Sequence, residues 1–159
     1  MKMKKVYFIT DYKGYFGSKY HSVPYRGGMD RELLSRFMAE KGFESVFVRP
    51  MREELDNHDL RAGITVFGSH QDKGLFYKSF LEDLAVALEA SGCAVCPSST
   101  LIRAHENKVF FEMLRQYAGS QPFRQIKSWW YGTYEEFKAA AGELPYPVLL
   151  KRPDGSMSR

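Results

Sequence analysis

The chain has 159 residues, of which 44% are hydrophobic and 15% aromatic, and its formal net charge is +4. This length fits one domain, or one domain and part of another, and the apolar content excludes wholesale disorder. No apolar run approaches the roughly 20 residues of a membrane-spanning helix, and the stretch after the N-terminal lysines is too short for a signal peptide. We therefore expect a cytoplasmic protein without a membrane partner, whose basic balance suits anionic ligands such as nucleotides.

Strand-like and helix-like patterns alternate over the first 120 residues. The expected strands are 4–12, 44–50, 64–69 and 93–98, and the expected helices are 30–42, 76–92 and 99–119. Asp30 is placed to cap the first helix and Gly42 to end it, and the polar stretch 51–63 is expected to be a short helix or a loop. This order predicts an α/β domain with a mostly parallel sheet, in which ligands bind beyond the carboxyl ends of the strands.

The pattern changes near residue 121, where SQPF is typical of a break between domains. A strand is expected at 124–132, a short helix capped by Thr133 at 133–144, and a further strand at 146–153. We therefore place one domain at 1–120 and a second piece at 121–159. The second piece is too short to close a core alone, so it leans on the first domain or begins something larger.

Cys93 and Cys96 form a CxxC pair on an expected strand that ends at Pro97. A redox pair of this kind normally opens a helix, and a zinc site needs further ligands at matching spacing. Three residues apart on a strand, the two side chains point to opposite faces, which favours a structural role for both. The four histidines, at positions 21, 58, 70 and 105, are not spaced as metal pairs, so no metal site is expected.

Neither common phosphate loop occurs: GxxxxGK[ST] and GxGxxG are both absent, which weighs against P-loop NTPases and dehydrogenases. A better signal is Lys151, at the end of the apolar run YPVLLK. A lysine there can neutralise a phosphate as a point charge. In the following DGSMS stretch, Gly155 allows close backbone approach and the hydroxyls of Ser156 and Ser158 can cradle an anion. The sequence PDG is also typical of an ordinary turn, so both interpretations stay open here.

The whole chain resembles the N-terminal part of the ATP-grasp superfamily, the carboxylate–amine ligase fold. HENKVFFEMLR is similar to the family helix whose (N/D)K lysine reaches ATP phosphate, and YPVLLKRPDGSMSR is similar to the strand, second ATP lysine and glycine-rich lid. The resemblance implies a Rossmann-like pre-ATP-grasp domain over 1–120 and the beginning of an α+β ATP-grasp lobe over 121–159. The chain departs from the family pattern at Arg152, where many members pass directly from Lys to Pro, and at Met157, within a lid of small residues.

The resemblance implies a function and a set of contacts. The residues expected to contact ATP are Lys108, Lys151, Gly155, Ser156 and Ser158, and the Mg²⁺ ligands are expected outside this chain. In the implied reaction a carboxylate attacks the γ-phosphate, and an amine, thiol or similar nucleophile displaces phosphate from the acyl phosphate. Because the family's lid continues into a larger lobe, the chain is expected to be an N-terminal fragment that lacks its C-terminal lobe and is inactive alone. An exposed YPVLL edge would favour aggregation or homodimers.

Candidate substrate contacts come from two loops. His70 and Asp72 lie in GSHQD, at the carboxyl end of an expected strand, where ligands of parallel sheets collect. Tyr25 and Arg26 belong to a long Tyr-rich loop after the first strand, whose length favours a binding loop. Tyrosine and arginine would suit a sugar or peptide-like substrate, but a loop packed by its own aromatic side chains fits this composition equally well.

Two other function classes fit parts of the sequence. One is a non-catalytic Rossmann-like module that binds a small ligand or sugar nucleotide, with the Tyr-rich loop as its pocket. The other is a nucleic-acid-binding α/β domain, which the basic charge and the aromatic content would suit. The chain has no Lys/Arg stripe and no recognition motif of such domains, so no nucleic-acid partner is expected.

Overall fold

The computed structural model describes residues 3–17, 28–69, 77–105 and 107–153. The chain divides into two compact units, residues 1–102 and 103–159, which we call the N-terminal unit and the C-terminal unit. This division lies ahead of the boundary that the sequence predicted near residue 121, because the helix over 108–118 groups with the segments that follow it. Within the described ranges, no helix combines the length and apolarity that a bilayer span requires.

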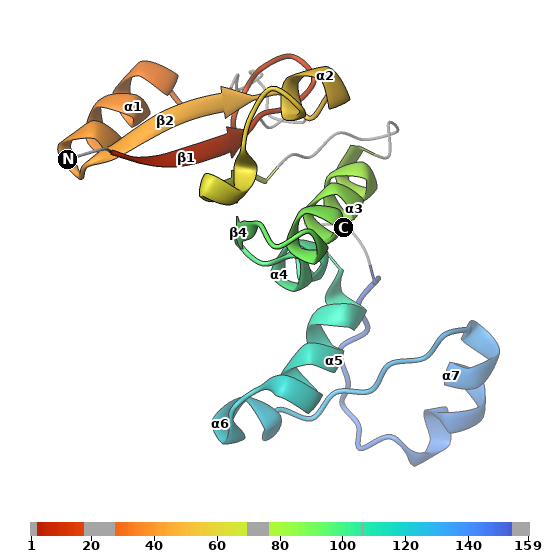
Figure 1. Cartoon of the computed structure of the whole chain (residues 1–159). Coiled ribbons are helices and arrows are strands. Elements are labelled where there is room, and N and C mark those ends of the chain that lie inside the picture. Colours follow the sequence, from red (N-terminus) through yellow and green to blue (C-terminus); the bar gives the residue numbers. More distant parts are fainter. Residues whose placement is uncertain (1–2, 18–27, 70–76, 106, 154–159) are drawn as a thin grey trace. The chain divides into compact units, whose positions relative to one another are not determined.

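The N-terminal unit alternates strands and helices (Figure 1). Its strands are β1 (Lys4–Ile9), β2 (Phe43–Val48), β3 (Gly63–Phe67) and β4 (Ala94–Cys96). Its helical elements are α1 (Arg31–Glu40), α2 (Arg52–Leu55), η1 (Leu60–Ala62) and α3 (Tyr77–Ala90), and α4 (Ser99–Ala104) runs across the division between the units. The four strands form one parallel sheet in the order β2-β1-β3-β4, which confirms the predicted α/β class.

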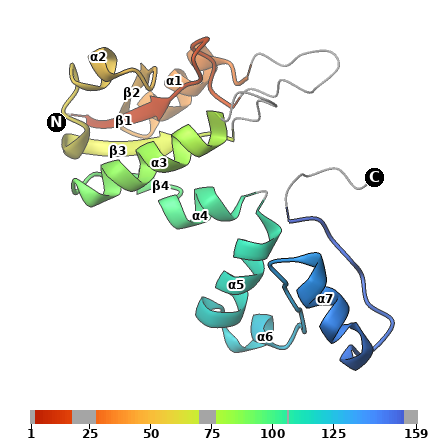
Figure 2. The same cartoon turned by 90° about the vertical axis from the view of Figure 1, so that its right-hand side faces the viewer.

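The sheet separates two hydrophobic clusters because alternate residues of a strand point to opposite faces. Tyr7 and Ile9 of β1 belong to the larger cluster, which also holds Leu81 and Ala85 of α3. Figure 2 shows α3 running alongside β3 and β4. Val6 and Phe8 belong to the second cluster, whose partly buried members include α1 residues. Both faces of β1 are therefore covered, which explains why its sequence is apolar without alternation.

The predicted ends of α1 are confirmed. The Asp30 carboxylate accepts a hydrogen bond from the backbone N–H of Leu33 at 3.0 Å, as an N-cap does. Gly42 has φ of +81°, a conformation that glycine adopts readily and that ends the helix before β2. At the other side of the unit, Glu89 of α3 accepts hydrogen bonds from the backbone N–H of Ser99 at 2.9 Å and from its hydroxyl, which ties α3 to the start of α4.

The C-terminal unit contains α5 (Lys108–Ala118), α6 (Gln121–Arg124), α7 (Tyr134–Ala140) and η2 (Ala141–Glu143). The single helix that the sequence predicted over 99–119 is wrong: α4 ends at Ala104 and α5 begins at Lys108. The break occurs because Asn107 caps α5, with its side-chain oxygen accepting from the backbone N–H of Phe110 at 3.0 Å. The predicted cap at Thr133 is confirmed, and Glu136 completes a capping box with it.

The two strands predicted in the C-terminal unit, at 124–132 and 146–153, do not form. Neither segment has a neighbouring strand in the described part of the chain, and a strand needs a partner for its backbone N–H and C=O groups. Leu149 and Leu150 are 81% and 68% exposed, so little apolar burial offsets the entropy of ordering this run. The run 146–153 is apolar enough for a strand, but the described elements include no strand that pairs with it.

Candidate functional site

The segments that carry the two predicted lysines are joined at the beginning of α5. Asn107 is the N-cap, so Lys108 is the first residue of the helix. The backbone N–H of Lys108 donates a 2.7 Å hydrogen bond to the carbonyl of Pro153, which lies two residues after Lys151. Figure 2 shows the segment after α7 returning towards this end of α5. A single backbone hydrogen bond therefore fastens the Lys151 segment to the turn that carries Lys108.

Glu112 is the carboxylate on α5 nearest in sequence to Lys108, and its ion pair is with Arg115. It lies one helical turn after Lys108, and residues four apart share a face of a helix. Partial burial acts to raise the pKa of Glu112, but hydrogen bonds from Arg115 and Ser128, with the positive charges of Arg115 and Lys151, hold this pKa below its usual range. Lys151 acts on Glu112 through its charge alone, and its effect is the smallest of these causes. We call Lys108, Glu112 and Lys151 the lysine site.

Arg115 fixes Glu112 from the other side. Its side chain is 8% exposed, which is rare for a charged residue without full pairing. Its Nε and Nη2 donate to Oε2 of Glu112 at 2.8 and 2.5 Å, Nη2 also donates to the Ser128 hydroxyl at 2.8 Å, and Nη1 donates to the Phe123 carbonyl. These contacts, which we call the Arg115 cluster, tie α5 to α6 and to the segment after it.

The lysine site has the chemistry of an anion site. The first-turn N–H groups of Lys108 and Phe110 already donate to Pro153 and Asn107, so the positive charge at this end of α5 comes chiefly from the ammonium groups of the two lysines. Lysine is suited to phosphate as a compact, strongly hydrated charge on a flexible stem. The lysines outnumber the single carboxylate among these three residues. The arrangement can therefore hold a phosphate group, whereas a metal ion would meet mainly repulsion.

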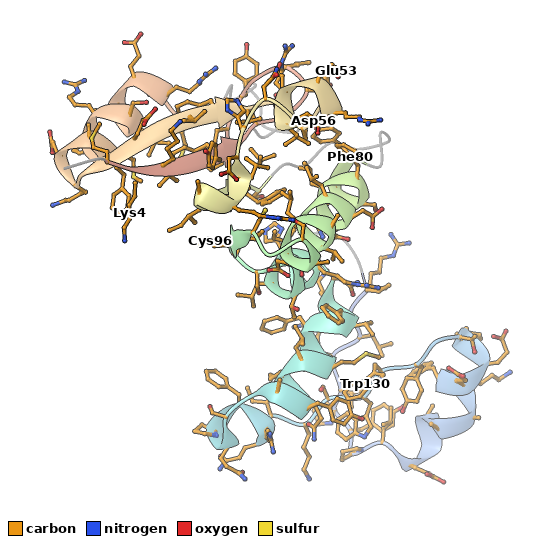
Figure 3. All side chains as sticks on the ribbon, in the orientation of Figure 1. Lys4, Glu53, Asp56, Phe80, Cys96 and Trp130 are labelled. Atoms are coloured by element: carbon orange, nitrogen blue, oxygen red, sulfur yellow. The ribbon has the colours of Figure 1, made fainter. Side chains whose placement is uncertain are left out.

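An aromatic hollow lies in the same unit. Ser128, Trp129, Trp130 and Tyr131 line a shallow depression of about 190 Å³. The Trp130 ring contacts the Tyr117 ring of α5 edge-on, with centroids 6.2 Å apart, and Figure 3 shows Trp130 beside this helix. Ser128 belongs both to this hollow and to the Arg115 cluster. The hollow is thus connected through Ser128 and Arg115 to Glu112 of the lysine site.

A second candidate site lies at the carboxyl edge of the sheet in the N-terminal unit. The connection after β1 leads to β2 on one side, and the connection after β3 leads to β4 on the other side. Parallel sheets bind ligands at such a switch point. Immediately after β1, the fully buried Asp11 accepts hydrogen bonds from the backbone N–H groups of Lys13 at 2.8 Å and Tyr15 at 2.9 Å. A carboxylate held in this way fixes the first turn of the loop.

Tyr77 lies at this edge with a buried hydroxyl that has no hydrogen-bond partner among the described residues. Its ring contacts the Tyr12 ring at a centroid distance of 5.4 Å. Burial, and then the charges of Asp11 and Tyr12, raise the pKa of Tyr77 above its ordinary value. An unsatisfied buried hydroxyl costs free energy, so its retention here favours a use for it. We call Asp11, Tyr12 and Tyr77 the carboxyl-edge site.

The remaining predicted contacts are not placed. Tyr25, Arg26, His70, Asp72, Gly155, Ser156 and Ser158 lie outside the described residues. The predicted strand position is confirmed for Cys96, which is exposed at the end of β4 (Figure 3), whereas the buried Cys93 lies one residue before this strand; both are free thiols. The described ranges contain no group of three or more His, Cys, Asp or Glu side chains that could hold a metal ion.

Sequence reasoning missed the residues that organise both sites. Glu112 and Arg115 are three apart on α5, a spacing that normally indicates an exposed ion pair, and nothing in the pattern shows that Arg115 is buried. Asp11 did carry a signal, because an acidic residue directly after a buried strand lies where ligands bind in parallel sheets. Tyr77 looked like an ordinary apolar position of α3.

Comparison with known proteins adds no relative: no family model, curated protein or solved structure matches the chain. Assignment of function therefore depends on the residues and on the geometry of the two sites.

Proposed function

We propose that the chain is the N-terminal part of an ATP-dependent ligase of the ATP-grasp kind, which activates a carboxylate as an acyl phosphate and joins it to an amine or similar nucleophile. The observation that supports this most is the hydrogen bond between Lys108 and Pro153, which brings Lys151 to the turn of α5 that carries Lys108. The backbone segments of two lysines that are widely separated in sequence, each expected to contact ATP phosphate, are thereby joined.

In this function the two lysines neutralise phosphate oxygens and hold them in one place. ATP would supply the phosphoryl group to the carboxylate, with ADP as the leaving group. Lys108 is positioned by the Asn107 cap and by the helix itself, whereas the segment of Lys151 is held by the hydrogen bond to the Pro153 carbonyl. Electrostatic positioning of this kind lowers the barrier to phosphoryl transfer without covalent chemistry by the protein.

The proposal has a second requirement. Phosphoryl transfer from ATP normally uses Mg²⁺, and the described residues offer no cluster of carboxylates that could hold it. The proposed ligase therefore needs Mg²⁺ ligands and an adenine-binding lobe from a further segment. On its own the chain is expected to bind the phosphates of ATP weakly and to catalyse no ligation.

Binding of ATP to the full chain tests this proposal. By isothermal titration at low ionic strength, Lys108→Met and Lys151→Met should each weaken ATP binding about tenfold or more, because each removes a charged contact. Lys138→Met is the matched control, since Lys138 is an exposed lysine on α7. Equal affinity in all four proteins would show that ATP does not use the lysine site.

The carboxyl-edge site favours a second function, a Rossmann-like module that binds a small ligand without catalysis. The observation behind it is the buried hydroxyl of Tyr77, which finds no hydrogen-bond partner in the part of the chain that the structure describes. UDP-glucose can serve as a sugar-nucleotide probe. UDP-glucose binding should weaken in Tyr77→Phe and stay unchanged in Lys108→Met. Under the ligase proposal, ATP binding should weaken in Lys108→Met and stay unchanged in Tyr77→Phe. Tyr7→Phe is the control, because the Tyr7 hydroxyl already donates to the carbonyl of Asp59 at 3.0 Å.

A further inference from the structure

Strand β2 forms one edge of the parallel sheet, with β1 on one side and, among the described elements, no strand on the other. Thr10 donates its backbone N–H to the carbonyl of Val48 at 2.9 Å, so this carbonyl faces β1. Successive residues of a strand turn their N–H and C=O groups to opposite sides. The backbone groups of Phe43, Ser45 and Phe47 therefore face away from β1, and no strand of the described chain pairs with them.

The β2 edge also lacks the features by which proteins keep their edge strands from pairing. Those features are lysine or proline on the edge, a bulge, or a very short strand. Within Phe43–Val48 there is no lysine and no proline, the register with β1 is continuous over six residues, and the one charged side chain is Glu44. At the opposite edge of the sheet, β4 has three residues. A strand of matching length is thus the partner that the β2 backbone fits.

Two features beside this edge are incomplete in one copy of the chain. The hydroxyl of Ser45 is buried and finds no hydrogen-bond partner within the described ranges, which costs free energy. Next to Phe47 lies a hollow of about 490 Å³, which is lined by this ring and by Arg31, Glu32 and Ser35 of α1. The Arg31 guanidinium lies over the Phe47 ring, 4.3 Å from its centroid. The hollow therefore presents both signs of charge, as a surface that meets a copy of itself requires.

We propose that β2 is a self-association surface, at which two copies of the chain pair antiparallel about a twofold axis at Ser45. In an antiparallel pair, opposite residues point to the same face of the sheet, and residues whose backbone groups face outward must meet each other. The register that pairs all three outward residues sets Ser45 opposite Ser45 and Phe43 opposite Phe47. The two Ser45 side chains, with Cβ atoms about 4.5–5.5 Å apart, then lie within reach of each other.

This register accounts for the hollow and for the size of the assembly. Phe43 and Phe47 both belong to the hydrophobic cluster on the α1 side of the sheet, so Phe43 of one copy comes to lie beside the hollow of the other. Glu44 lies opposite Val46, so no like charges face each other along the two strands. Because a twofold contact uses the same strand in both copies, it closes as a dimer and does not extend into a filament.

Sedimentation equilibrium of the full chain tests whether the dimer forms. Ser45→Pro removes an outward N–H and leaves the hydrogen bonds to β1 in place, so circular dichroism should show the fold retained. Since the twofold axis counts each substitution twice, the dimer should weaken about tenfold or more in this variant. Glu44→Gln, on the same strand, is the control and should dimerise as the wild type does. A wild type that stays monomeric up to about 1 mM, or a Ser45→Pro variant that dimerises normally, would overturn the proposal.

Disulfide trapping tests the register without a proline. Glu44 of one copy and Val46 of the other form a non-hydrogen-bonded pair, whose Cα atoms lie about 4.5 Å apart, within the range of a disulfide. In a Cys96→Ser background, oxidation of a mixture of Glu44→Cys and Val46→Cys proteins should give the mixed dimer. Each variant alone should stay uncross-linked, because its two copies of the new thiol lie on a diagonal of about 7–8 Å. Absence of the mixed dimer, or equal cross-linking of Glu44→Cys alone, would overturn the proposed pairing.

Discussion

The two units of this chain are held together in different ways. In the N-terminal unit, apolar side chains on both faces of β1 are buried, and the hydrophobic clusters extend into α1 and α3. In the described part of the C-terminal unit, the buried residues are Ala104 and Arg115. Apolar burial is non-directional and scales with area, whereas the hydrogen bonds of an arginine depend on each partner. The first unit should therefore tolerate loss of a polar contact better than the second.

The C-terminal unit also leaves many large apolar side chains in solvent. Among its described residues, those exposed are Phe111, Tyr117, Phe123, Ile126, Trp129, Tyr134, Tyr146, Leu149 and Leu150. Large exposed apolar surfaces are typical of regions that meet another surface. This agrees with a lobe that needs a further segment, and it means that most substitutions of apolar residues here should cost little stability.

The largest expected effect is in the core of the N-terminal unit. Ile9 is fully buried, so Ile9→Ala should lower the free energy of unfolding by about 2–5 kcal/mol. Ile126 of the C-terminal unit is 58% exposed, and Ile126→Ala should change that free energy by less than about 0.5 kcal/mol. Urea denaturation followed by circular dichroism measures both. Equal costs would contradict the contrast between the units.

The next effect is loss of the Arg115 cluster. Arg115→Met removes the partner of Glu112 and the donors to Ser128 and the Phe123 carbonyl, and should destabilise the C-terminal unit by about 1–3 kcal/mol. Both tryptophans of the chain, Trp129 and Trp130, lie in this unit, so their fluorescence reports on it alone. Arg124→Met is the control: it removes two exposed hydrogen bonds, to the carbonyls of Gly119 and Tyr117, whose oxygens can bind water instead, and should cost less than about 1 kcal/mol.

Loss of a helix N-cap should cost a similar free energy of unfolding in both units, because a cap bonds only to residues of its own helix. Thr133→Ala in the C-terminal unit and Asp30→Ala in the N-terminal unit each remove one N-cap hydrogen bond and should each cost about 1 kcal/mol. Thermal unfolding of the two variants gives the comparison. A much larger cost at Thr133 would mean that α7 supports the rest of its unit.

The smallest expected effect concerns Tyr77. Tyr77→Phe removes a buried hydroxyl without a partner in the described chain and should be neutral or stabilising by up to about 1 kcal/mol, whereas Tyr7→Phe loses a made hydrogen bond and should cost about 1 kcal/mol. Because the pKa of folded Tyr77 is raised above 10.0, its unfolded form ionises first. Stability should therefore fall as the pH rises above about 10, and Tyr77→Phe should reduce this fall. A steeper fall in the variant would contradict the account.

Much of the N-terminal unit could be predicted from sequence. Its strands are apolar runs bounded by breakers, and Asp30 and Gly42 mark the ends of α1 through local chemistry. Such signals need no knowledge of distant residues. The phosphate contacts of Lys108 and Lys151 stay a prediction: Lys108 does open α5, but the strand expected before Lys151 does not form.

The C-terminal unit was harder to predict because its contacts are not local. The run YPVLLK has the composition of a strand, but whether it pairs depends on a neighbour that the composition does not show. Arg115 has the spacing of a surface residue, and its burial follows from how α6 and Ser128 fold back on α5. Asn107 could have been recognised as a cap that divides the predicted helix at 99–119, but the apolar periodicity of that stretch concealed the break.

The most direct test of the central claim is a double-mutant cycle on tripolyphosphate binding with Lys108→Met, Lys151→Met and the double variant, followed by isothermal titration. If both lysines hold one ligand, each single substitution should weaken binding about tenfold or more, and the double loss should be smaller than the product of the two. Two independent, multiplicative losses, or no loss in either single variant, would contradict a shared site at the start of α5.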